Sequence, residues 1–224
     1  MTLMSTPRVE FLRGLRAEIA HNYGVGRAVV AVDGAPGSGT AEFADDLAAV
    51  FREVGHNSFR ASLEDFHTPR AVRYRHGRES AEAYYRDSYD YALLRRVLLD
   101  PYRMGGSTGF VTVAFDVRRD AQVEPKWLSA DVDAMLVVDG PFLNRPQTRG
   151  LWDYSIFLDA DDVVRYERLA ASIGVDPDPD APSNAKYREG WELYLADGGP
   201  RLLASAIVDD NDAARPWRVF SDSC

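Results

Sequence analysis

Cysteine is almost absent from this chain of 224 residues, because its single cysteine is the last residue, Cys224. One thiol excludes a disulfide within the chain and any metal centre built on several cysteines. Cysteine usage of this kind predicts a cytoplasmic protein. No apolar run reaches about 18 residues, and the N-terminal stretch lacks the apolar core of a signal peptide, so we expect neither a membrane span nor a secretory leader.

Positive charge is also in short supply. The chain carries 26 Lys and Arg against 35 Asp and Glu, which gives a formal net charge of -9. A surface that follows the phosphates of nucleic acid or an anionic membrane needs an excess of basic residues, so we expect neither partner. Hydrophobic residues make up 46% of the chain, enough at this length for one domain with a substantial core. A monomer and a homo-oligomer are both compatible with this composition.

Short apolar segments alternate with segments of helical periodicity, which is the pattern of a parallel sheet covered by helices. The sequence predicts strands at residues 27–34, 57–64, 133–140, 154–160 and 205–210. It predicts helices at residues 7–22, 40–54, 80–99, 161–173 and 185–203. The Asp- and Pro-rich segment 174–184 is expected to form a surface loop. These elements predict an α/β fold in a single domain over residues 1–224, with strand 27–34 at the centre of a mainly parallel sheet.

The stretch GAPGSGTA at residues 34–41 joins the first predicted strand to an amphipathic helix. Its glycines allow a tight turn with inward N–H groups, and the following helix adds the positive end of its dipole. The spacing fits the phosphate-binding motif G-x-x-x-x-G-K-[ST], although a plain strand-to-helix turn is the alternative. The predicted nucleotide-phosphate residues are Gly34, Ala35, Gly37, Ser38, Gly39, Thr40 and Ala41.

The end of this loop departs from the motif. Thr40 stands where the motif has lysine, and Ala41 stands where it has serine or threonine. The first change removes a cation for the β- and γ-phosphates, and the second removes a magnesium ligand. Glu42 adds a negative charge in the first helical turn, which repels a nucleotide. We therefore expect weak binding of Mg-ATP.

Three further segments follow in a definite order. They are EDFHTPR at 64–70, YRDSYDY at 85–91, and DGPFLNRP at 139–146 with WDYSIFLDA after it. With the glycine loop, they resemble the bacterial uridine kinase-like proteins of the P-loop nucleoside kinases, which are related to phosphoribulokinase and pantothenate kinase. The resemblance spans residues 27–212. It implies a P-loop NTPase-type three-layer α/β/α fold, an acceptor-site insertion at about 65–130 and a lid at about 165–190.

The same resemblance implies an activity and a set of roles. The activity is transfer of the γ-phosphate of ATP or GTP to a nucleoside or similar hydroxyl acceptor, with Mg²⁺. Glu64 stands at the position of the usual base, with Asp65 beside it as an alternative. Asp139 stands at the position of the acid that holds magnesium, and Arg165 and Arg168 lie at the entrance of the lid. Each carboxylate also has an ordinary alternative, as the cap of a loop or of a strand-end turn.

Residues for the acceptor come from separate segments. The candidates are His67, Arg70, Asp87, Asp116 and Arg118, each with a surface role as its alternative. We expect at least three of His67, Arg70, Asp87 and Asp116 to border one pocket next to the glycine loop. We also expect Glu64 and Asp139 to converge with that loop on one crevice.

Two hypotheses of different classes follow from these residues. The first is a uridine kinase-like phosphotransferase impaired by its loop. The second is a non-catalytic homologue that binds a ligand or a partner through the same fold. An unrelated dinucleotide-binding protein is disfavoured, because GAPGSG has no well-placed ribose-binding acid after it.

Overall fold

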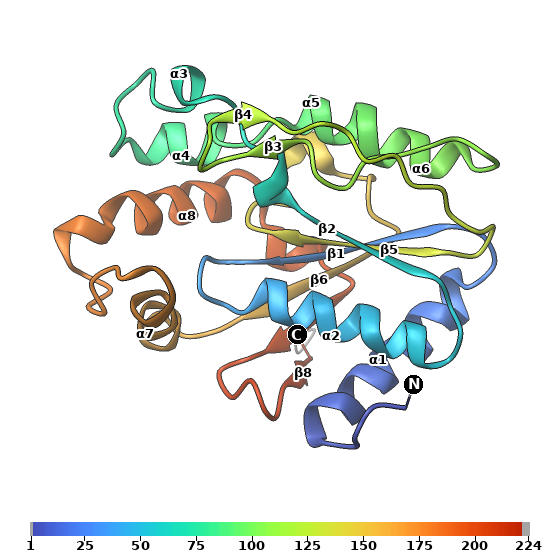
Figure 1. The fold of residues 1–224 in the computed structure, drawn as a ribbon. Coiled ribbons are helices and arrows are strands. Elements are labelled where there is room, and N and C mark those ends of the chain that lie inside the picture. The colour runs from blue at the N-terminus through green and yellow to red at the C-terminus, as the bar shows by residue number, and fades with distance from the viewer. Residues whose placement is uncertain (1, 221–224) are drawn as a thin grey trace.

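The computed structural model describes residues 2–220 and contains a six-stranded sheet in the order β2-β5-β1-β6-β7-β8 (Figure 1). Its strands are β1 (Ala28–Gly34), β2 (Ser58–Ser62), β5 (Met135–Gly140), β6 (Tyr154–Asp159), β7 (Ala206–Asp209) and β8 (Trp217–Val219). All neighbouring strands run parallel except β7 and β8. The central position expected for β1 is confirmed, since β1 pairs with β5 and β6 and all its residues are buried.

Helices cover both faces of this sheet (Figure 1). On one face lie α1 (Pro7–Tyr23) and α2 (Thr40–Glu53), whose apolar residues pack on β1, β5 and β6. On the other lie α4 (Ala81–Asp87), α5 (Tyr91–Leu94), α6 (Asp100–Met104) and α8 (Ala185–Gly198). The expected three-layer α/β/α architecture with a mainly parallel sheet is therefore confirmed.

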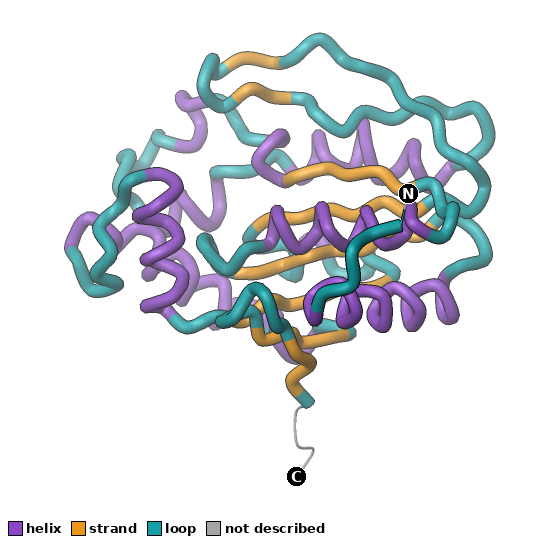
Figure 2. The backbone as a smooth tube through the Cα atoms, turned by 60° about the horizontal axis from the view of Figure 1, so that its bottom comes forward, coloured by secondary structure: helices purple, strands orange, loops and turns teal. Residues whose placement is uncertain are grey.

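The remaining elements are short, apart from helix α7. They are η1 (Leu63–Phe66), α3 (Arg70–Arg73), η2 (Arg95–Leu99), η3 (Pro146–Thr148), α7 (Asp162–Ile173), η4 (Pro182–Asn184) and α9 (Pro200–Leu203). The strands β3 (Phe115–Asp116) and β4 (Ala121–Gln122) pair with each other, away from the large sheet (Figure 2). None of the helices in residues 2–220 is long and apolar enough to cross a membrane.

Two predicted helices are interrupted. The helix expected at 80–99 stops at Asp87, because the backbone of Ser88 and Asp90 pairs with residues 66–68, at the end of η1. Thr68 N–H donates to the Ser88 carbonyl at 2.9 Å, and Asp90 N–H donates to the Phe66 carbonyl at 2.7 Å. The helix expected at 185–203 ends at Gly198, since Gly199 has φ +55 and Pro200 begins the separate helix α9.

The strand expected at 57–64 ends two residues early. Ser62 adopts an extended conformation, and its hydroxyl accepts a hydrogen bond from Glu64 N–H at 3.4 Å, which starts η1. Glu64 therefore lies in a tight turn beyond the strand. The parallel register places Ser62 beside Asp139 and Asp33 beside Gly140, so the carboxyl ends of β2, β5 and β1 share one edge.

Candidate functional site

The glycine loop forms an open turn at this edge. Gly37 and Gly39 have φ +83 and +87, and Ser38 N–H closes the turn on the Ala35 carbonyl at 2.9 Å. Within residues 2–220, the N–H groups of Gly37, Gly39, Thr40 and Ala41 donate to no protein acceptor. These donors surround the start of α2, a helix of 14 residues. The loop therefore has free donors for an anion.

Helix α7 supports this loop from behind. A Cβ on Gly37 would lie 2.4 Å from the Arg165 carbonyl oxygen, which only glycine tolerates. The Arg165 guanidinium donates to the Pro36 carbonyl at 3.2 Å and pairs with Asp162 at 2.5 Å. Arg165 therefore contacts the backbone of the loop on the side of α7. Its predicted contact with nucleotide stays a prediction.

Two cavities meet at the glycine loop. The first, here called the central cavity, measures about 390 Å³ and reaches from the loop to α3, α4 and α8. The second, the lateral cavity, measures about 380 Å³ and reaches from the loop to α7 and the segment after β7. Both are lined by Gly37, Thr40, Ala41 and Leu169. A ligand in one cavity would therefore share the loop with a ligand in the other.

Glu64 lines the central cavity and is held by two neighbours. Its carboxylate accepts a hydrogen bond from the Tyr89 hydroxyl at 2.5 Å, and its other oxygen lies 2.9 Å from His67 Nε2. His67 Nδ1 lies 2.9 Å from the Ser88 carbonyl, which only accepts, so we assign a proton to Nδ1. Partial withdrawal from water opposes ionisation of Glu64, but His67 and Tyr89 outweigh it and lower the pKa of Glu64. Glu64 is thus an oriented carboxylate that faces the cavity.

Asp139 also lines the central cavity, but it already has a cation as partner. The Arg60 guanidinium lies 2.7 Å from one carboxylate oxygen, and the Ser62 hydroxyl lies 3.3 Å from the other. Arg60 also donates to the Val137 carbonyl at 2.8 Å, which fixes it between β2 and β5. Burial raises the pKa of Asp139, although Arg60 opposes that shift. The expected convergence of the glycine loop, Glu64 and Asp139 on one crevice is confirmed.

Asp65 lies beside this group, outside the lining of the central cavity. Burial raises the pKa of Asp65, and the negative charges of Asp139 and Glu64 raise it further. Within residues 2–220, however, no group of three or more His, Cys, Asp or Glu side chains is placed to hold a metal ion. Asp139 would be the carboxylate ligand of a Mg²⁺ ion bound mainly by phosphate and water oxygens, because magnesium takes one or two carboxylates in such sites, but Arg60 already pairs with it.

The expectation that at least three of the four acceptor candidates border one pocket next to the glycine loop is wrong. Of the four candidates expected to share one pocket, His67 lines the central cavity. Asp87 instead pairs with Arg75 at 2.9 Å, beside a separate surface pocket. The Asp116 carboxylate caps a turn by accepting from Arg118 N–H at 2.9 Å.

Arg70 and Arg118 are likewise not among the residues that line the central cavity, and the Arg70 guanidinium donates instead to the Arg118 carbonyl at 3.2 Å. Local hydrogen bonds hold the side chains of Arg70 and Asp116, which the sequence pattern did not reveal.

Arg168 lies in the lateral cavity, next to the start of α2. Its guanidinium donates to the Asp210 carbonyl at 2.7 Å and lies 3.6 Å from the Asp210 carboxylate. Arg8, from α1, pairs with the same carboxylate at 3.1 Å. Burial raises the pKa of Asp210, although both arginines oppose that shift. Arg168 therefore lies beside the loop in contact with a buried acid, and its predicted contact with nucleotide stays a prediction.

Sequence reasoning missed several residues of the central cavity. They are Ser62, Arg73, Tyr74, Tyr84, Tyr89, Lys186 and Tyr187. It also missed Arg60, the partner of Asp139. One signal was available, since Arg60 is a charged residue inside a short strand of otherwise apolar and small residues. The tyrosines carry no such signal, because tyrosine occurs in hydrophobic cores as well as in binding cavities.

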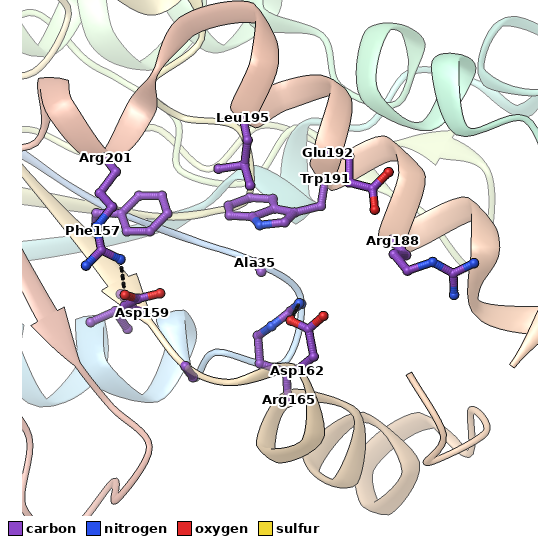
Figure 3. A pocket seen from close by; sticks show the side chains of 12 residues that line it. Ala35, Phe157, Asp159, Asp162, Arg165, Arg188, Trp191, Glu192, Leu195 and Arg201 are labelled. Carbon is purple, nitrogen blue, oxygen red and sulfur yellow. Dashed lines mark hydrogen bonds and ion pairs between the residues drawn. The ribbon is translucent and has the colours of Figure 1, made fainter. Parts of the chain in front are cut away.

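A third cavity, of about 300 Å³, lies behind the loop between α7, α8 and the end of β6 (Figure 3). Phe157 and Trp191 stack at 5.9 Å along its apolar wall, and Arg201 pairs with Asp159 at its rim. The loop reaches this cavity through Ala35. The loop residues with free N–H groups line the central and lateral cavities and not this third one. The central and lateral cavities therefore form the candidate site.

Comparison with known proteins agrees with the fold. The sequence matches no model of a known protein family. A protein of Bacillus stearothermophilus described as a possible uridine kinase superposes with a TM-score of 0.70 at 24% identity, over 89% of this chain and 96% of that chain. D-glycerate 3-kinase from Cryptococcus neoformans superposes with a TM-score of 0.58 at 11% identity, over 96% of this chain and 97% of that chain.

One curated protein shows a local likeness. A DNA gyrase inhibitor of Citrobacter rodentium is 38% identical over 71 residues, which are 31% of this chain and 43% of that protein. The chain thus matches less than half of the length of that relative. Taken with the sheet order and the two covered faces, the structural likeness shows that this chain has the α/β fold of the P-loop kinases.

Proposed function

We propose that the protein is a uridine kinase-like phosphotransferase that moves the γ-phosphate of ATP or GTP to the hydroxyl group of a small acceptor. The observation that carries this proposal is the meeting of two cavities at a glycine loop with free N–H groups. The lateral cavity would take the nucleotide, and the central cavity would take the acceptor. The loop between them would hold the phosphates that both substrates share.

Two carboxylates of the central cavity have roles in this proposal. Glu64 would accept the proton of the attacking hydroxyl, because its carboxylate is oriented by His67 and Tyr89 and still faces the cavity. Asp139 would hold Mg²⁺, which neutralises charge on the phosphates when it is bound. In the lateral cavity, Arg168 would contact the nucleotide phosphates near the start of α2.

The altered loop sets the expected rate. Thr40 and Ala41 supply neither the cation nor the metal ligand of the usual motif, and Glu42 lines the lateral cavity with a negative charge. Loss of one preorganised donor costs about 3–4 kcal/mol of transition-state stabilisation. Two such losses favour turnover well below the roughly 1 s⁻¹ of a slow ordinary enzyme.

A second candidate is a non-catalytic relative that binds a ligand through the same cavities. The specific observation in its favour is the ion pair between Arg60 and Asp139, which occupies the carboxylate that magnesium would need. In this candidate, the glycine loop and the central cavity would bind a phosphorylated ligand without transfer.

Restoration of the loop tests the proposal. In the variant Thr40→Lys, Ala41→Thr, Glu42→Thr, calorimetric titration should show at least tenfold tighter binding of Mg-ATP, about 1.4 kcal/mol. The control Ser107→Lys adds a positive charge in an exposed loop near Arg27, at the opposite edge of the sheet, and should leave the affinity unchanged.

One result would contradict the proposed activity, and another would contradict only the expected slow rate. An affinity for Mg-ATP that stays the same in the restored variant would mean that the loop is no longer a nucleotide site, and would leave the non-catalytic candidate. Turnover by the unmodified protein at roughly 1 s⁻¹ or faster would mean that another cation replaces the loop lysine.

A further inference from the structure

The charged side chains of the central cavity are paired, with one exception. Glu64 has His67 at 2.9 Å, and Asp139 has Arg60 at 2.7 Å. Arg73 has Asp120 at 3.2 Å. Within residues 2–220, the ammonium group of Lys186 makes no hydrogen bond or ion pair.

Lys186 lies instead among three aromatic rings. Its Nζ atom is 5.6 Å from the ring centroids of Tyr74 and Tyr84 and 5.3 Å from that of Tyr187. These faces attract a cation but accept none of its three hydrogen bonds. Withdrawal from water lowers the pKa of Lys186. The group thus faces the cavity with its donors free.

The surroundings of Lys186 fix its position. Tyr84 meets Phe142 at 5.3 Å and Tyr187 at 5.1 Å, both edge to face. A Cβ on Gly190 would lie 2.7 Å from Tyr84 Cδ1, so α8 packs directly on this ring. Lys186 also lies in the first turn of α8, where the helix dipole disfavours a cation. An anion beside Lys186 would relieve this repulsion and restore its hydrogen bonds.

We propose that Lys186 binds an anionic group of the ligand in the central cavity, so that this ligand is a small hydroxylated phosphate or carboxylate rather than a neutral nucleoside. The proposal rests on the proposed function in one respect, because it treats the central cavity as the acceptor side. Lys186 lines the part of the central cavity between α3, α4 and α8, so the anion would lie away from Arg168, which lines the lateral cavity.

Matched pairs of ligands test this proposal without nucleotide or phosphate transfer. Calorimetric titration should show at least tenfold tighter binding of D-ribose 5-phosphate than of D-ribose, or of D-glycerate than of glycerol. The pair with the larger ratio identifies phosphate or carboxylate as the preferred anion. In Lys186→Met, the preference of that pair should fall at least tenfold, and in Lys186→Arg it should persist.

The second lysine supplies the control. Lys126 and Lys186 are the two lysines of the sequence, and Lys126 is exposed. Lys126→Met should leave both ratios unchanged. Thermal melting of each variant shows whether it is folded. If Lys186→Met is unfolded, amine labelling of the unmodified protein replaces it: the anionic ligand should slow acetylation of Lys186 at least fivefold and leave Lys126 unaffected.

Three outcomes would overturn the inference. One is equal affinity for the anionic and neutral members of both pairs. Another is a preference that survives in Lys186→Met. The third is a loss of Mg-ATP affinity in Lys186→Met with no loss for the anionic sugar, which would assign Lys186 to the nucleotide. None of these measurements depends on phosphate transfer. Failure of this inference can therefore be distinguished from failure of the proposed function.

Discussion

The Arg60 guanidinium lies 2.7 Å from both Asp45 and Asp139 and is anchored to the Val137 carbonyl. The side chain of Asp139 is 4% exposed and that of Arg60 is 19% exposed, so the pair is largely withdrawn from water. A buried carboxylate loses much more from a missing partner than the pair contributes by itself. In the proposed function, Arg60 would therefore compete with a metal ion for the Asp139 carboxylate.

We predict that the substitution Arg60→Met destabilises the protein. The variant leaves Asp139 buried without its cation, so the free energy of unfolding in urea should fall by about 2–4 kcal/mol. The double variant Arg60→Met, Asp139→Asn should recover most of that loss. Magnesium should raise the melting temperature of Arg60→Met more than that of the unmodified protein, because it replaces the missing charge.

The matched control for Arg60 is Arg52→Met. Arg52 is exposed in α2, and its removal should change the free energy of unfolding by no more than about 0.5 kcal/mol. The role given to Arg60 is wrong if Arg60→Met is as stable as this control and shows no response to magnesium.

At the scale of elements, the glycine loop and α7 are coupled by close backbone packing. Gly37 has φ +83, and a Cβ there would lie 2.4 Å from the Arg165 carbonyl oxygen. Gly26 has φ +100, and a Cβ there would meet no atom within 4 Å. The two positions share a left-handed backbone and differ in whether a helix lies against them.

This contrast gives the second prediction. Gly26→Ala should cost about 1–2 kcal/mol, the strain of a left-handed alanine. Gly37→Ala should cost about 1–3 kcal/mol more, because α7 must move to admit the methyl group. Urea unfolding measures both, and calorimetry should show weaker binding of inorganic triphosphate to Gly37→Ala alone. Equal stabilities of the two variants would contradict the packing of α7 on the loop.

At the scale of the whole molecule, two apolar clusters lie on opposite faces of one sheet. One contains Leu12 of α1, and the other contains Leu98 of η2, and both side chains are fully buried. The strands β1 and β5 contribute alternate residues to each cluster, so neither face can lose its packing without disturbing the other. We infer that the chain unfolds as a single unit.

Substitutions in the two clusters test whether both faces of the sheet unfold together. Leu12→Ala and Leu98→Ala should each lower the free energy of unfolding by about 2–5 kcal/mol. Both variants should still show one transition, with the same midpoint by far-ultraviolet circular dichroism and by tryptophan fluorescence. Leu202→Ala, at an 87% exposed position, should change little. Separate midpoints in Leu12→Ala would mean that α1 and its face unfold independently.

The sequence by itself determined the elements whose cause is local. Apolar runs predicted the five parallel strands, and the glycines of residues 34–39 predicted an open turn, because the apolar pattern and the tolerance of positive φ are properties of the local sequence. The acids at strand ends could be expected at one edge, since parallel strands end together. Interruption of the helix at Ser88 could not, because the hydrogen bonds that break it come from residues 66–68.

Only the tertiary structure decided which side chains meet. The pairing of β2 with β5 brings Arg60 to Asp139 across 79 positions of sequence, and the packing of α8 on α4 brings Lys186 to Tyr84. Asp87 and Asp116 fit a sugar-binding pattern in sequence, yet Arg75 and the turn at Arg118 hold them elsewhere. The physical reason is that a charged side chain takes the nearest available partner, and that partner is set by packing over long distances in the chain.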